Sequence, residues 1–376
     1  MGLRQEEADR EFARQAVGEK RLTSAQMEEC RGAQMGLADR GIQRALPALT
    51  FELGLLPKPV IEQLIRHVIR RVGPIQVGGY DLTQQIGRGG MGIVFKGKQL
   101  RMDRTVAVKL LLRSSMTDVM VEKFRHECRL SARLRHHNLV ALIESGESDG
   151  WHFMAMEHVC GCTLAKLVEE KGPLPEADAV EICAKIADAL HHAHQNGIIH
   201  RDVKPANVMI GADGEPKLCD LGLAQARDVD ETQMKANGLT VGSRRYMSPE
   251  QVRGIGHMDL RTDIYSLGLT LFFALTGKPP FRDVHQKYVM LEHLKGQLHW
   301  PAEAGAKVSD DVCWTVMRMA APNPADRYNS AQDLASDLTN LAKRLRERGP
   351  REEVSKPLPS ILPDARDKDT PGSSVS

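Results

Sequence analysis

The sequence is poor in aromatic residues and carries almost no net charge, and both shortages exclude classes of function. Phe, Trp and Tyr make up only 4% of the 376 residues, so an aromatic platform for stacking nucleic-acid bases is not expected. The 51 basic and 49 acidic side chains leave a formal net charge of +2, which is too little for binding by phosphate neutralisation. The chain is therefore predicted not to bind nucleic acid.

Long apolar runs and paired cysteines are missing as well. No stretch of about 18 uninterrupted apolar residues occurs, which predicts that the chain does not insert into a membrane. The charged first twenty residues lack the apolar run of a signal peptide. The seven cysteines are odd in number and lack the spacing of a disulfide framework or a zinc site, which suits a reducing compartment. These observations together predict a cytoplasmic protein.

The composition changes twice along the chain and divides it into three zones. Residues 1–79 are charged and helical in pattern, and they are predicted to form an extension that binds a partner or regulates the rest. Residues 80–345 hold every motif that carries chemistry. Residues 346–376 are rich in Pro, Ser and charge without periodicity, which predicts a disordered tail.

The first zone contains a faint internal repeat. Residues 22–28 echo residues 56–62 at an offset of 34, and each copy predicts a helix, a short turn and a helix. Thr23 and Gln26 have the spacing of a capping box, and Pro57 stands where a first helical residue is expected. A small helical bundle or an extension docked on the next domain is favoured over a dedicated sensor. A truncation that alters partner binding but not turnover would identify an interaction module.

The second zone changes from strand patterns to helix patterns. Segments 80–86, 93–98 and 105–111 are rich in β-branched residues and predict strands, and 118–134 predicts a helix. Helical patterns dominate after Gly172. We therefore expect an α+β fold with two lobes, a small one rich in β-structure and a larger helical one.

A glycine-rich motif lies between the first two predicted strands. Gly87, Gly89, Gly90 and Gly92 would let the backbone approach phosphate groups and point its N–H groups at them. A dinucleotide fingerprint leads directly into a helix, whereas this motif leads into the strand that starts at Ile93. The context therefore favours a phosphate-binding loop that joins two strands.

A lysine and a glutamate that could form an ion pair follow the glycine motif along the chain. Lys109 ends the apolar run of the third predicted strand, and Glu127 lies in the helix that comes next. Each alone has an ordinary structural explanation, as a lysine at a sheet edge or a solvated helix face. Beside the glycine motif, the pair favours a lysine that contacts phosphates and is held by an ion pair.

Three further segments resemble the motifs of one family. The segment 200–207 reads His-Arg-Asp-Val-Lys-Pro-Ala-Asn and resembles the catalytic loop of protein kinases. Asp220-Leu221-Gly222 resembles the Asp-Phe-Gly motif, and 242–250 is similar to the end of an activation segment. Over residues 80 to about 342 the chain resembles the bacterial eukaryotic-like (Hanks-type) serine/threonine protein kinases.

The resemblance implies a two-lobed protein-kinase-like fold and a set of catalytic roles. Such a protein transfers the γ-phosphate of Mg-ATP to Ser or Thr hydroxyls of protein substrates. Asp202 would accept the proton of the substrate hydroxyl, and Lys204 would offset charge on the transferred phosphoryl group. Asn207 and Asp220 would bind Mg²⁺ through oxygen atoms. Lys109, held by Glu127, completes the implied catalytic set.

Two structural roles follow from the same resemblance. In the segment 262–268, Asp263 resembles the buried helix aspartate that supports the catalytic loop. Arg327 resembles the arginine that forms an ion pair with Glu250 at the end of the activation segment.

The resemblance also implies the contacts of ATP. The phosphates would lie under the glycine motif, and the adenine edge would meet the backbone of the segment that joins the lobes. The implied ATP-binding residues are Ile86, Gly87, Gly89, Gly90, Gly92, Val94, Ala107, Lys109, Met156, Glu157 and Val159.

The activation segment and two alternatives complete the sequence-based interpretation. Thr240 is favoured over Thr232 as a site of regulatory autophosphorylation. A catalytically silent scaffold of the same fold is disfavoured, because the lysine, aspartate and asparagine positions are all intact. A small-molecule phosphotransferase is disfavoured, because Ser248-Pro249-Glu250 ends a long activation segment.

Overall fold

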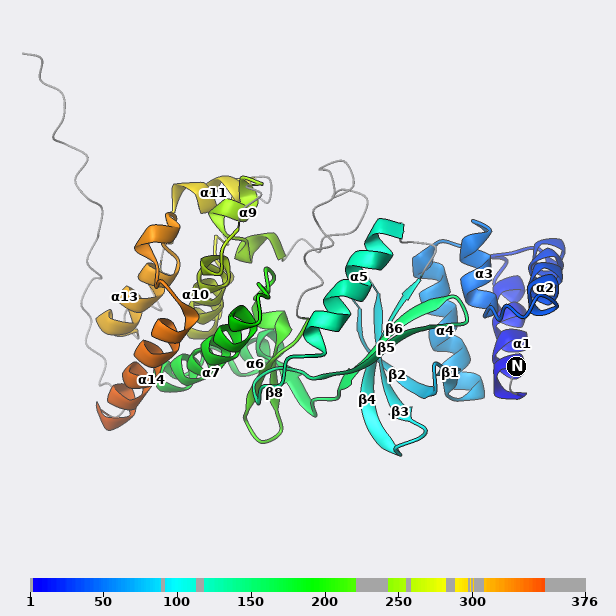
Figure 1. Cartoon of the computed structure of the whole chain (residues 1–376), viewed down its shortest axis with the longest axis horizontal. Helices are drawn as coiled ribbons and strands as arrows, with labels where there is room; N and C mark the ends of the chain where they lie inside the picture. Colours follow the sequence, from blue (N-terminus) through cyan, green and yellow to red (C-terminus); the bar gives the residue numbers. More distant parts are fainter. Residues whose placement is uncertain are drawn as a thin grey trace, which may run out of the picture.

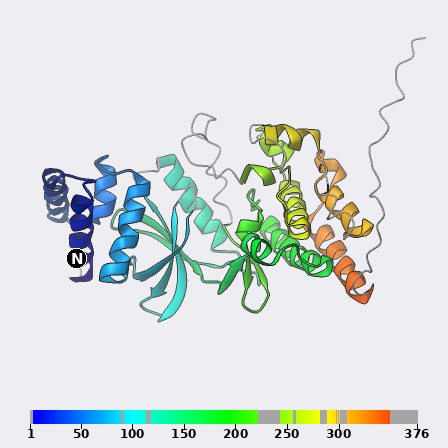
Figure 2. The ribbon, with the colours of Figure 1, turned by 180° about the vertical axis from the view of Figure 1, so that it is seen from behind.

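A β-sheet occupies the middle of the molecule, with four N-terminal helices at one end and a helical lobe at the other (Figure 1). The computed structural model describes residues 3–88, 92–112, 118–220, 243–254, 258–281, 288–296, 298, 300 and 308–348. Within these ranges, no helix combines the length and the apolar character needed to cross a membrane. The view from behind shows the same order of layers (Figure 2).

The sheet of the small lobe has six strands in the order β1-β2-β3-β4-β6-β5, and every neighbouring pair is antiparallel. The predicted strands are found within two residues of their expected ends. The strands are β1 (Ile75–Val77), β2 (Tyr80–Arg88), β3 (Ile93–Gln99), β4 (Arg104–Leu112), β5 (Leu142–Ser148) and β6 (Trp151–Glu157).

The strand register gives the sheet one largely apolar face. Residues directly opposite each other on neighbouring strands point to the same side. Ile93 is paired with Leu110, which is paired with Phe153, and Phe95 is paired with Val108. All five side chains are buried. Such a face requires a covering layer in a protein of this size, because exposed apolar patches of this extent are unfavourable.

Four helices supply that layer. They are α1 (Leu3–Gly18), α2 (Ser24–Ala38), α3 (Leu46–Glu52) and α4 (Lys58–Val72). Phe12, Leu46 and Leu64 from the helices belong to one continuous core cluster with Tyr80 and Phe95 from the sheet. The cavity left between helices and sheet has a volume of about 20 Å³, enough for a single water. The layers are therefore closely packed.

The predicted boundary at residue 79 falls within a β-hairpin of the small-lobe sheet. Val77 of β1 is paired with Tyr80 of β2, so Gly78 and Gly79 form a two-residue hairpin turn. Their φ angles of +58° and +85° suit this turn and favour glycine. The prediction of a purely helical first zone is wrong for residues 75–77, because β1 is an edge strand of the sheet. The Gly-Gly pair between two short apolar segments is the signal that could have found it.

The internal repeat corresponds to two helix–turn–helix units, α1–α2 and α3–α4. The N–H of Arg21 donates to the carbonyl of Ala16 (2.9 Å), and 34 residues later Leu55 donates to Thr50 with the same length. The predicted capping box of Thr23 is confirmed. Pro57 precedes the first residue of α4 instead of being that residue. The two units thus share one backbone pattern, although only the second packs along β2.

The opposite face of the sheet is covered in part by α5 (Asp118–Ser131). Phe124 and Cys128 of this helix pack against Leu111 and Met154 of the sheet. The helix ends three residues before the predicted end at 134, because the N–H groups of Arg133 and Leu134 bond three residues back instead of four.

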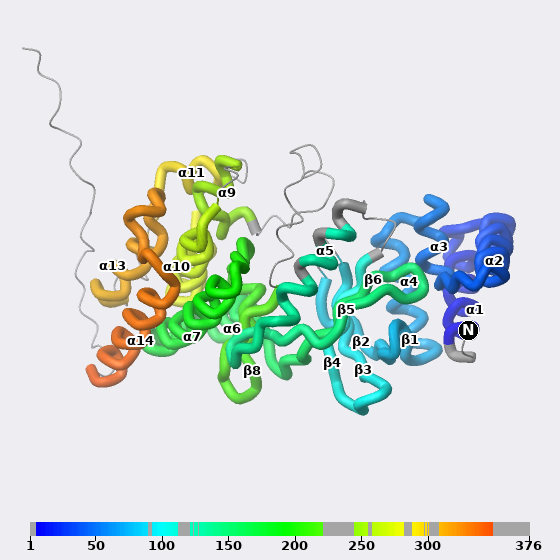
Figure 3. Tube along the Cα trace, viewed as in Figure 1, coloured from blue at the N-terminus to red at the C-terminus, as the bar shows by residue number. Residues whose placement is uncertain are grey.

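The helical lobe is built around α7, α10 and α14 (Figure 3). Side chains of these helices form a second buried core. Helix α14 continues to Arg348, three residues into the predicted tail, and Arg348 forms an ion pair with Asp311 at 3.1 Å. Residues 349–376 lie outside the described part. The helices are α6 (Leu164–Lys171), α7 (Glu176–Gln195), α9 (Pro249–Val252), α10 (Arg261–Thr276), α11 (Val289–Lys295), α13 (Asp310–Met319) and α14 (Ala331–Arg348), and a small sheet contains β7 (Gly161–Thr163), β8 (Val208–Gly211) and β9 (Pro216–Leu218).

Candidate active site

Asp263 of α10 supports the loop between α7 and β8. Its fully buried carboxylate accepts hydrogen bonds from the backbone N–H groups of His200 (2.8 Å) and Arg201 (2.7 Å). Nε2 of His194 lies 2.8 Å from the same carboxylate. Burial alone would raise the pKa of Asp263, but His194 and the backbone donors hold it below its ordinary value. The ionised carboxylate thus fixes the backbone of the loop, as the resemblance implied.

Three of the predicted site residues meet on this loop. Nζ of Lys204 lies 2.8 Å from Oδ2 of Asp202. Nδ2 of Asn207 donates to the backbone carbonyl of Asp202 (2.8 Å) and to its Oδ2 (3.2 Å). Two donors therefore aim one carboxylate oxygen, and the position of Asp202 is fixed before any substrate is present.

Backbone contacts join the same loop to Asp220. The N–H of Cys219 donates to the carbonyl of Asn207, and Nε2 of His200 lies 2.9 Å from the carbonyl of Cys219. Nδ1 of His200 accepts the N–H of Asp202 at 3.2 Å, so the ring carries its proton on Nε2. Asp220 follows with a left-handed φ of +60°, a conformation that is rare outside glycine.

Lys109 and Asp220 connect the two lobes directly. Nζ of Lys109 lies 2.7 Å from Oδ1 of Asp220, and the lysine side chain is 7% exposed. Partial burial would raise the pKa of Asp220, but the positive charges of Lys109 and Lys204 hold it below its ordinary value. Glu127 belongs to α5, but its side chain lies outside the described residues. The described partner of Lys109 is therefore the carboxylate of Asp220.

The predicted nucleotide-binding residues share the face of the sheet that the N-terminal helices leave open. Gly87 is opposite Val94, and Val94 is opposite Lys109. Ala107 is opposite Met156 on the same side of the sheet. The register therefore brings these five residues, Lys109 among them, together on one face of the sheet.

The remaining nucleotide-binding predictions lie at the edges of this face. A Cβ on Gly92 would overlap the carbonyl oxygen of Leu110, so the close approach of the strands requires glycine. Ile86 is exposed, and β6 ends at Glu157, two residues before Val159. Gly89, Gly90 and the predicted phosphorylation site Thr240 lie outside the described residues.

Residues 80–346 match the family described as the protein kinase domain. The chain belongs to the protein kinase family. Its kinase region is 38% identical over 267 residues to the serine/threonine-protein kinase PknB of Mycobacterium leprae, which covers 70% of this chain and 43% of that protein. It is 35% identical over 291 residues to the serine/threonine-protein kinase PrkC of Bacillus subtilis, which covers 76% of this chain and 44% of that protein. The resemblance to bacterial eukaryotic-like serine/threonine protein kinases is thus confirmed.

The chain spans less than half the length of the curated relatives that it matches. A probable serine/threonine-protein kinase of Corynebacterium efficiens shows the same proportion, with 37% identity over 287 residues, 74% of this chain and 43% of that protein. The family match starts at residue 80, so α1–α4 lie before it. The helices that complete the core of the small lobe are therefore outside the matched region.

Oxygen atoms of the kinase's site suit a hard divalent cation. Asn207 uses its amide nitrogen for Asp202, so its Oδ1 is the atom that can ligate a cation. Asp220 contributes a carboxylate that Lys109 keeps ionised. Carboxylate and amide oxygens with additional waters and phosphates are the ligands that Mg²⁺ prefers. Among the described residues, no cluster of three or more His, Cys, Asp or Glu side chains offers a site built from protein groups alone.

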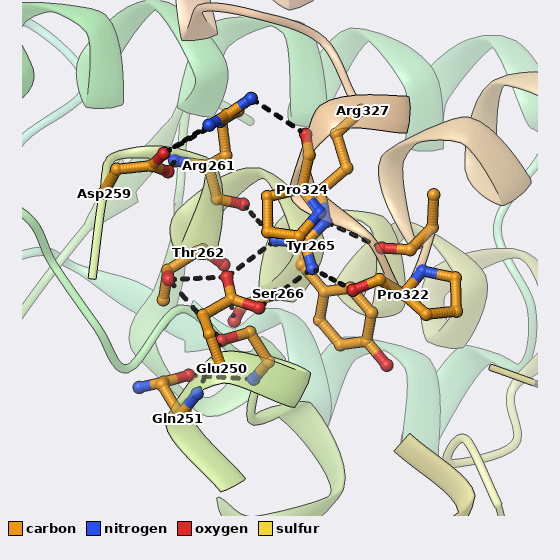
Figure 4. A network of polar contacts seen from close by, with 12 residues as sticks. Glu250, Gln251, Asp259, Arg261, Thr262, Tyr265, Ser266, Pro322, Pro324 and Arg327 are labelled. Carbon is orange, nitrogen blue, oxygen red and sulfur yellow. Dashed lines mark hydrogen bonds and ion pairs between the residues drawn. The ribbon is translucent and has the colours of Figure 1, made fainter. Parts of the chain in front are cut away.

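A buried ion pair in the helical lobe joins α9 to the residues that precede α14 (Figure 4). Nη1 and Nη2 of Arg327 lie 2.7 and 3.0 Å from the two carboxylate oxygens of Glu250. This pair was expected from the sequence and is confirmed. Thr262 donates to Glu250 at 2.8 Å, and the ring of Tyr265 lies 4.8 Å from the guanidinium. These two contributors were not predicted from the sequence, although both lie in the segment 262–268 around Asp263.

His293 of α11 is a second contact that sequence reasoning missed. Its Nδ1 lies 2.9 Å from the hydroxyl of Tyr265, and its Nε2 lies 2.9 Å from the carbonyl of Arg244. The Tyr hydroxyl donates to Nδ1 while Nε2–H donates to the carbonyl, so the ring is neutral. Burial lowers the pKa of His293 from 6.5 to about 4. A neutral, fully buried imidazole therefore holds the 3₁₀ turn Ser243–Tyr246 against α10 and α11.

We expect His293 to make the kinase sensitive to acid. Between pH 6.5 and about 4 the unfolded chain binds a proton at this residue and the folded protein does not. The free energy of unfolding therefore falls as pH drops through this window, by about 3 kcal/mol from this residue in total. Urea denaturation at several pH values should show a smaller decrease for His293→Gln. His137→Gln, a control with a side chain that is 70% exposed, should keep the native dependence, and equal curves for all three proteins would refute the assignment.

Proposed function

We propose that the chain is a serine/threonine protein kinase that transfers the γ-phosphate of Mg-ATP to Ser or Thr hydroxyls of protein substrates. One observation carries the proposal. Lys204 and Asn207 converge on one carboxylate oxygen of Asp202, on a loop that backbone hydrogen bonds join to Asp220 and thus to Lys109. The names of the bacterial relatives support Ser and Thr as the acceptor residues.

The residues of the loop would act on the acceptor hydroxyl. Asp202 accepts its proton as the oxygen forms a bond to the γ-phosphorus and the bond to the β-phosphate oxygen breaks. Lys204, 2.8 Å from Asp202, offsets the charge on the transferred group. Lys109 contacts the α- and β-phosphates, and Glu127 steadies this lysine. Asn207 and Asp220 would hold Mg²⁺, which supplies positive charge between the phosphates when it is bound.

The open face of the sheet would hold the nucleotide. Val94 and Ala107 pack on the adenine ring, and Met156 limits the depth of the pocket. The backbone of Glu157 and Val159 meets the polar edge of the ring. The carboxylate of Glu157 is already paired with Lys217 of β9 at 2.9 Å, which is consistent with a role for its backbone.

The proposal extends to regulation, partners and location. Thr240 is the proposed site of autophosphorylation, and residues 1–79 are the proposed site for a protein partner. A cytoplasmic location is supported by seven cysteines that all have free thiols.

Replacing Lys109 tests the proposal most directly. In Lys109→Met the phosphates lose a positioned cation, so transfer of labelled γ-phosphate from ATP should fall by about 10²-fold. Lys98→Met, on the neighbouring strand β3 and exposed, serves as the matched control and should transfer at the native rate. The labelled residues are then identified by mass spectrometry. Label on Ser and Thr supports the proposal, whereas label confined to Tyr, or none with the native chain, contradicts it.

A further inference from the structure

Helix α4 lies along β2, the strand that leads into the glycine motif. Its residues Ile61, Leu64 and Val68 are buried in the same core cluster as Tyr80 and Leu82 of β2. The helix is therefore anchored by apolar packing at the start of the strand. Two polar contacts continue the interface toward the end of the strand, where the nucleotide-binding residues begin.

The first polar contact is a buried ion pair. The side chain of Glu62 on α4 is 2% exposed, and its Oε2 lies 2.8 Å from Nε of Arg88, whose side chain is 52% exposed. Burying a carboxylate is unfavourable unless a cation compensates for the lost hydration. Arg88 is the last residue of β2 and directly follows Gly87. The ion pair thus connects α4 to the end of β2, next to the glycine motif.

The second contact consists of two successive side-chain interactions that connect α4 to the backbone of Gly87, the first glycine of the motif. Nη1 of Arg66 donates to Oε1 of Gln85 (2.9 Å), and Nε2 of Gln85 lies 3.4 Å from the carbonyl oxygen of Gly87. The β2–β3 register shifts between Gln85 and Gly87. Such an irregularity interrupts the regular ladder and bends the strand. Side chains from α4 therefore help to define the path of β2 where the ladder alone does not.

A charged residue of α4 also interacts electrostatically with Lys109. Burial lowers the pKa of Lys58, the first residue of α4; Glu62 opposes this, and Arg88 and Lys109 lower it further. Three cations and one carboxylate thus share an electrostatic neighbourhood beside the strand end. This neighbourhood contains residues from both sides of the boundary at which the family match begins.

We propose that α4 positions the end of β2 for ATP, with Glu62 as a positioning residue that acts through Arg88. The inference rests on the proposed function, because it takes ATP as the ligand. When α4 holds Gln85 to Arg88 in place before the nucleotide arrives, ATP has less of the strand end to order on binding. Such pre-organisation raises the apparent affinity by raising the population of the binding-competent state.

The internal repeat provides a matched control. Glu28 stands 34 residues before Glu62, at the equivalent position of α2, and it is exposed. Both glutamates therefore occupy the same place in a repeated helix–turn–helix unit, and only Glu62 faces β2. Replacing each by Gln makes the same chemical change in two equivalent helices.

The dissociation constant of Mg-ATP, measured by titration calorimetry on the full chain, tests the proposal. We expect Glu62→Gln to raise it about fivefold and Glu28→Gln to leave it unchanged. Arg88→Met, at a half-exposed side chain, should match Glu62→Gln, and the double variant should add nothing further because the two residues act as a pair. In turnover assays the KM for ATP should rise with no change in kcat at saturating ATP, which a general loss of folding would not produce.

Amide hydrogen exchange over residues 80–88 tests the contact without ATP. Exchange should be faster in Glu62→Gln than in Glu28→Gln, because α4 no longer holds the strand end. Equal or tighter ATP binding by Glu62→Gln overturns the inference and leaves the proposed function standing. A native chain that neither binds ATP nor transfers phosphate overturns the proposed function and with it the ATP role of α4. Equal exchange in the two variants overturns the contact itself.

Discussion

Asp202→Asn should lower kcat for phosphoryl transfer by about 10³-fold while ATP still binds, because the variant loses the group that accepts the hydroxyl proton. Asn keeps an oxygen that accepts the hydrogen bonds from Lys204 and Asn207, so the loop should keep its shape. The nucleotide residues lie on the sheet, away from the change. The measurement is the initial rate of γ-phosphate transfer to a Ser/Thr peptide, with ATP affinity measured in parallel.

Asp188→Asn is the control for this experiment. Asp188 lies on α7 with its side chain 62% exposed, and it contacts His136 rather than the loop. We expect native turnover from this variant. An Asp202→Asn protein that turns over like the native chain would remove Asp202 from the mechanism. A protein that loses ATP binding as well would show that the aspartate supports the nucleotide site rather than the acceptor.

Phe12→Ala should lower the free energy of unfolding by about 3–5 kcal/mol, as truncating a fully buried aromatic side chain does. Phe12 is 1% exposed and lies in the core cluster that joins α1–α4 to the sheet. Although it is remote from every catalytic residue, the effect should extend to the small lobe. Urea denaturation monitored by circular dichroism measures the change.

Met35→Ala is the matched surface control for the N-terminal helices. Met35 of α2 is 69% exposed, so its truncation should change the unfolding free energy by no more than about 0.5 kcal/mol. An equally small effect of Phe12→Ala would mean that the helices and the sheet do not share a core. The shared core also changes how a truncation is interpreted. Deleting the helices would expose the apolar face around Phe95 and Val108, so lost turnover would not by itself identify an interaction module.

The convergence of the proposed catalytic side chains was predictable, because these residues lie in short segments with characteristic sequences. The spacing of Asp202, Lys204 and Asn207 within one loop sets their relative positions almost without reference to the rest of the fold. The pairing of Glu250 with Arg327 was also found, although the two residues are far apart in the sequence, because each belongs to a recognisable segment. Resemblance to a family therefore predicted contacts in segments where particular residue types are required.

The role of the first zone was less predictable, because it depends on packing between distant segments. Strand β1 has only three residues, too few for a periodic pattern, and its partner β2 had been assigned to the next zone. The exposure of Glu28 and the burial of Glu62 differ although the repeat makes them equivalent. Only the sheet beneath α4 distinguishes them. A sequence shows which residues share one face of a helix, but it does not show which surface that face packs against.

The shared core has a consequence for synthesis on the ribosome. Helices α1–α4 are synthesised before the strands that bury their apolar faces, and these strands end only with β6 at Glu157. At about 5–20 residues per second, translation needs several seconds to deliver the missing strands. During that interval the nascent helices expose Phe12, Leu46 and Leu64. We therefore expect helices α1–α4 to be prone to aggregation during synthesis until the strands of the sheet complete their core.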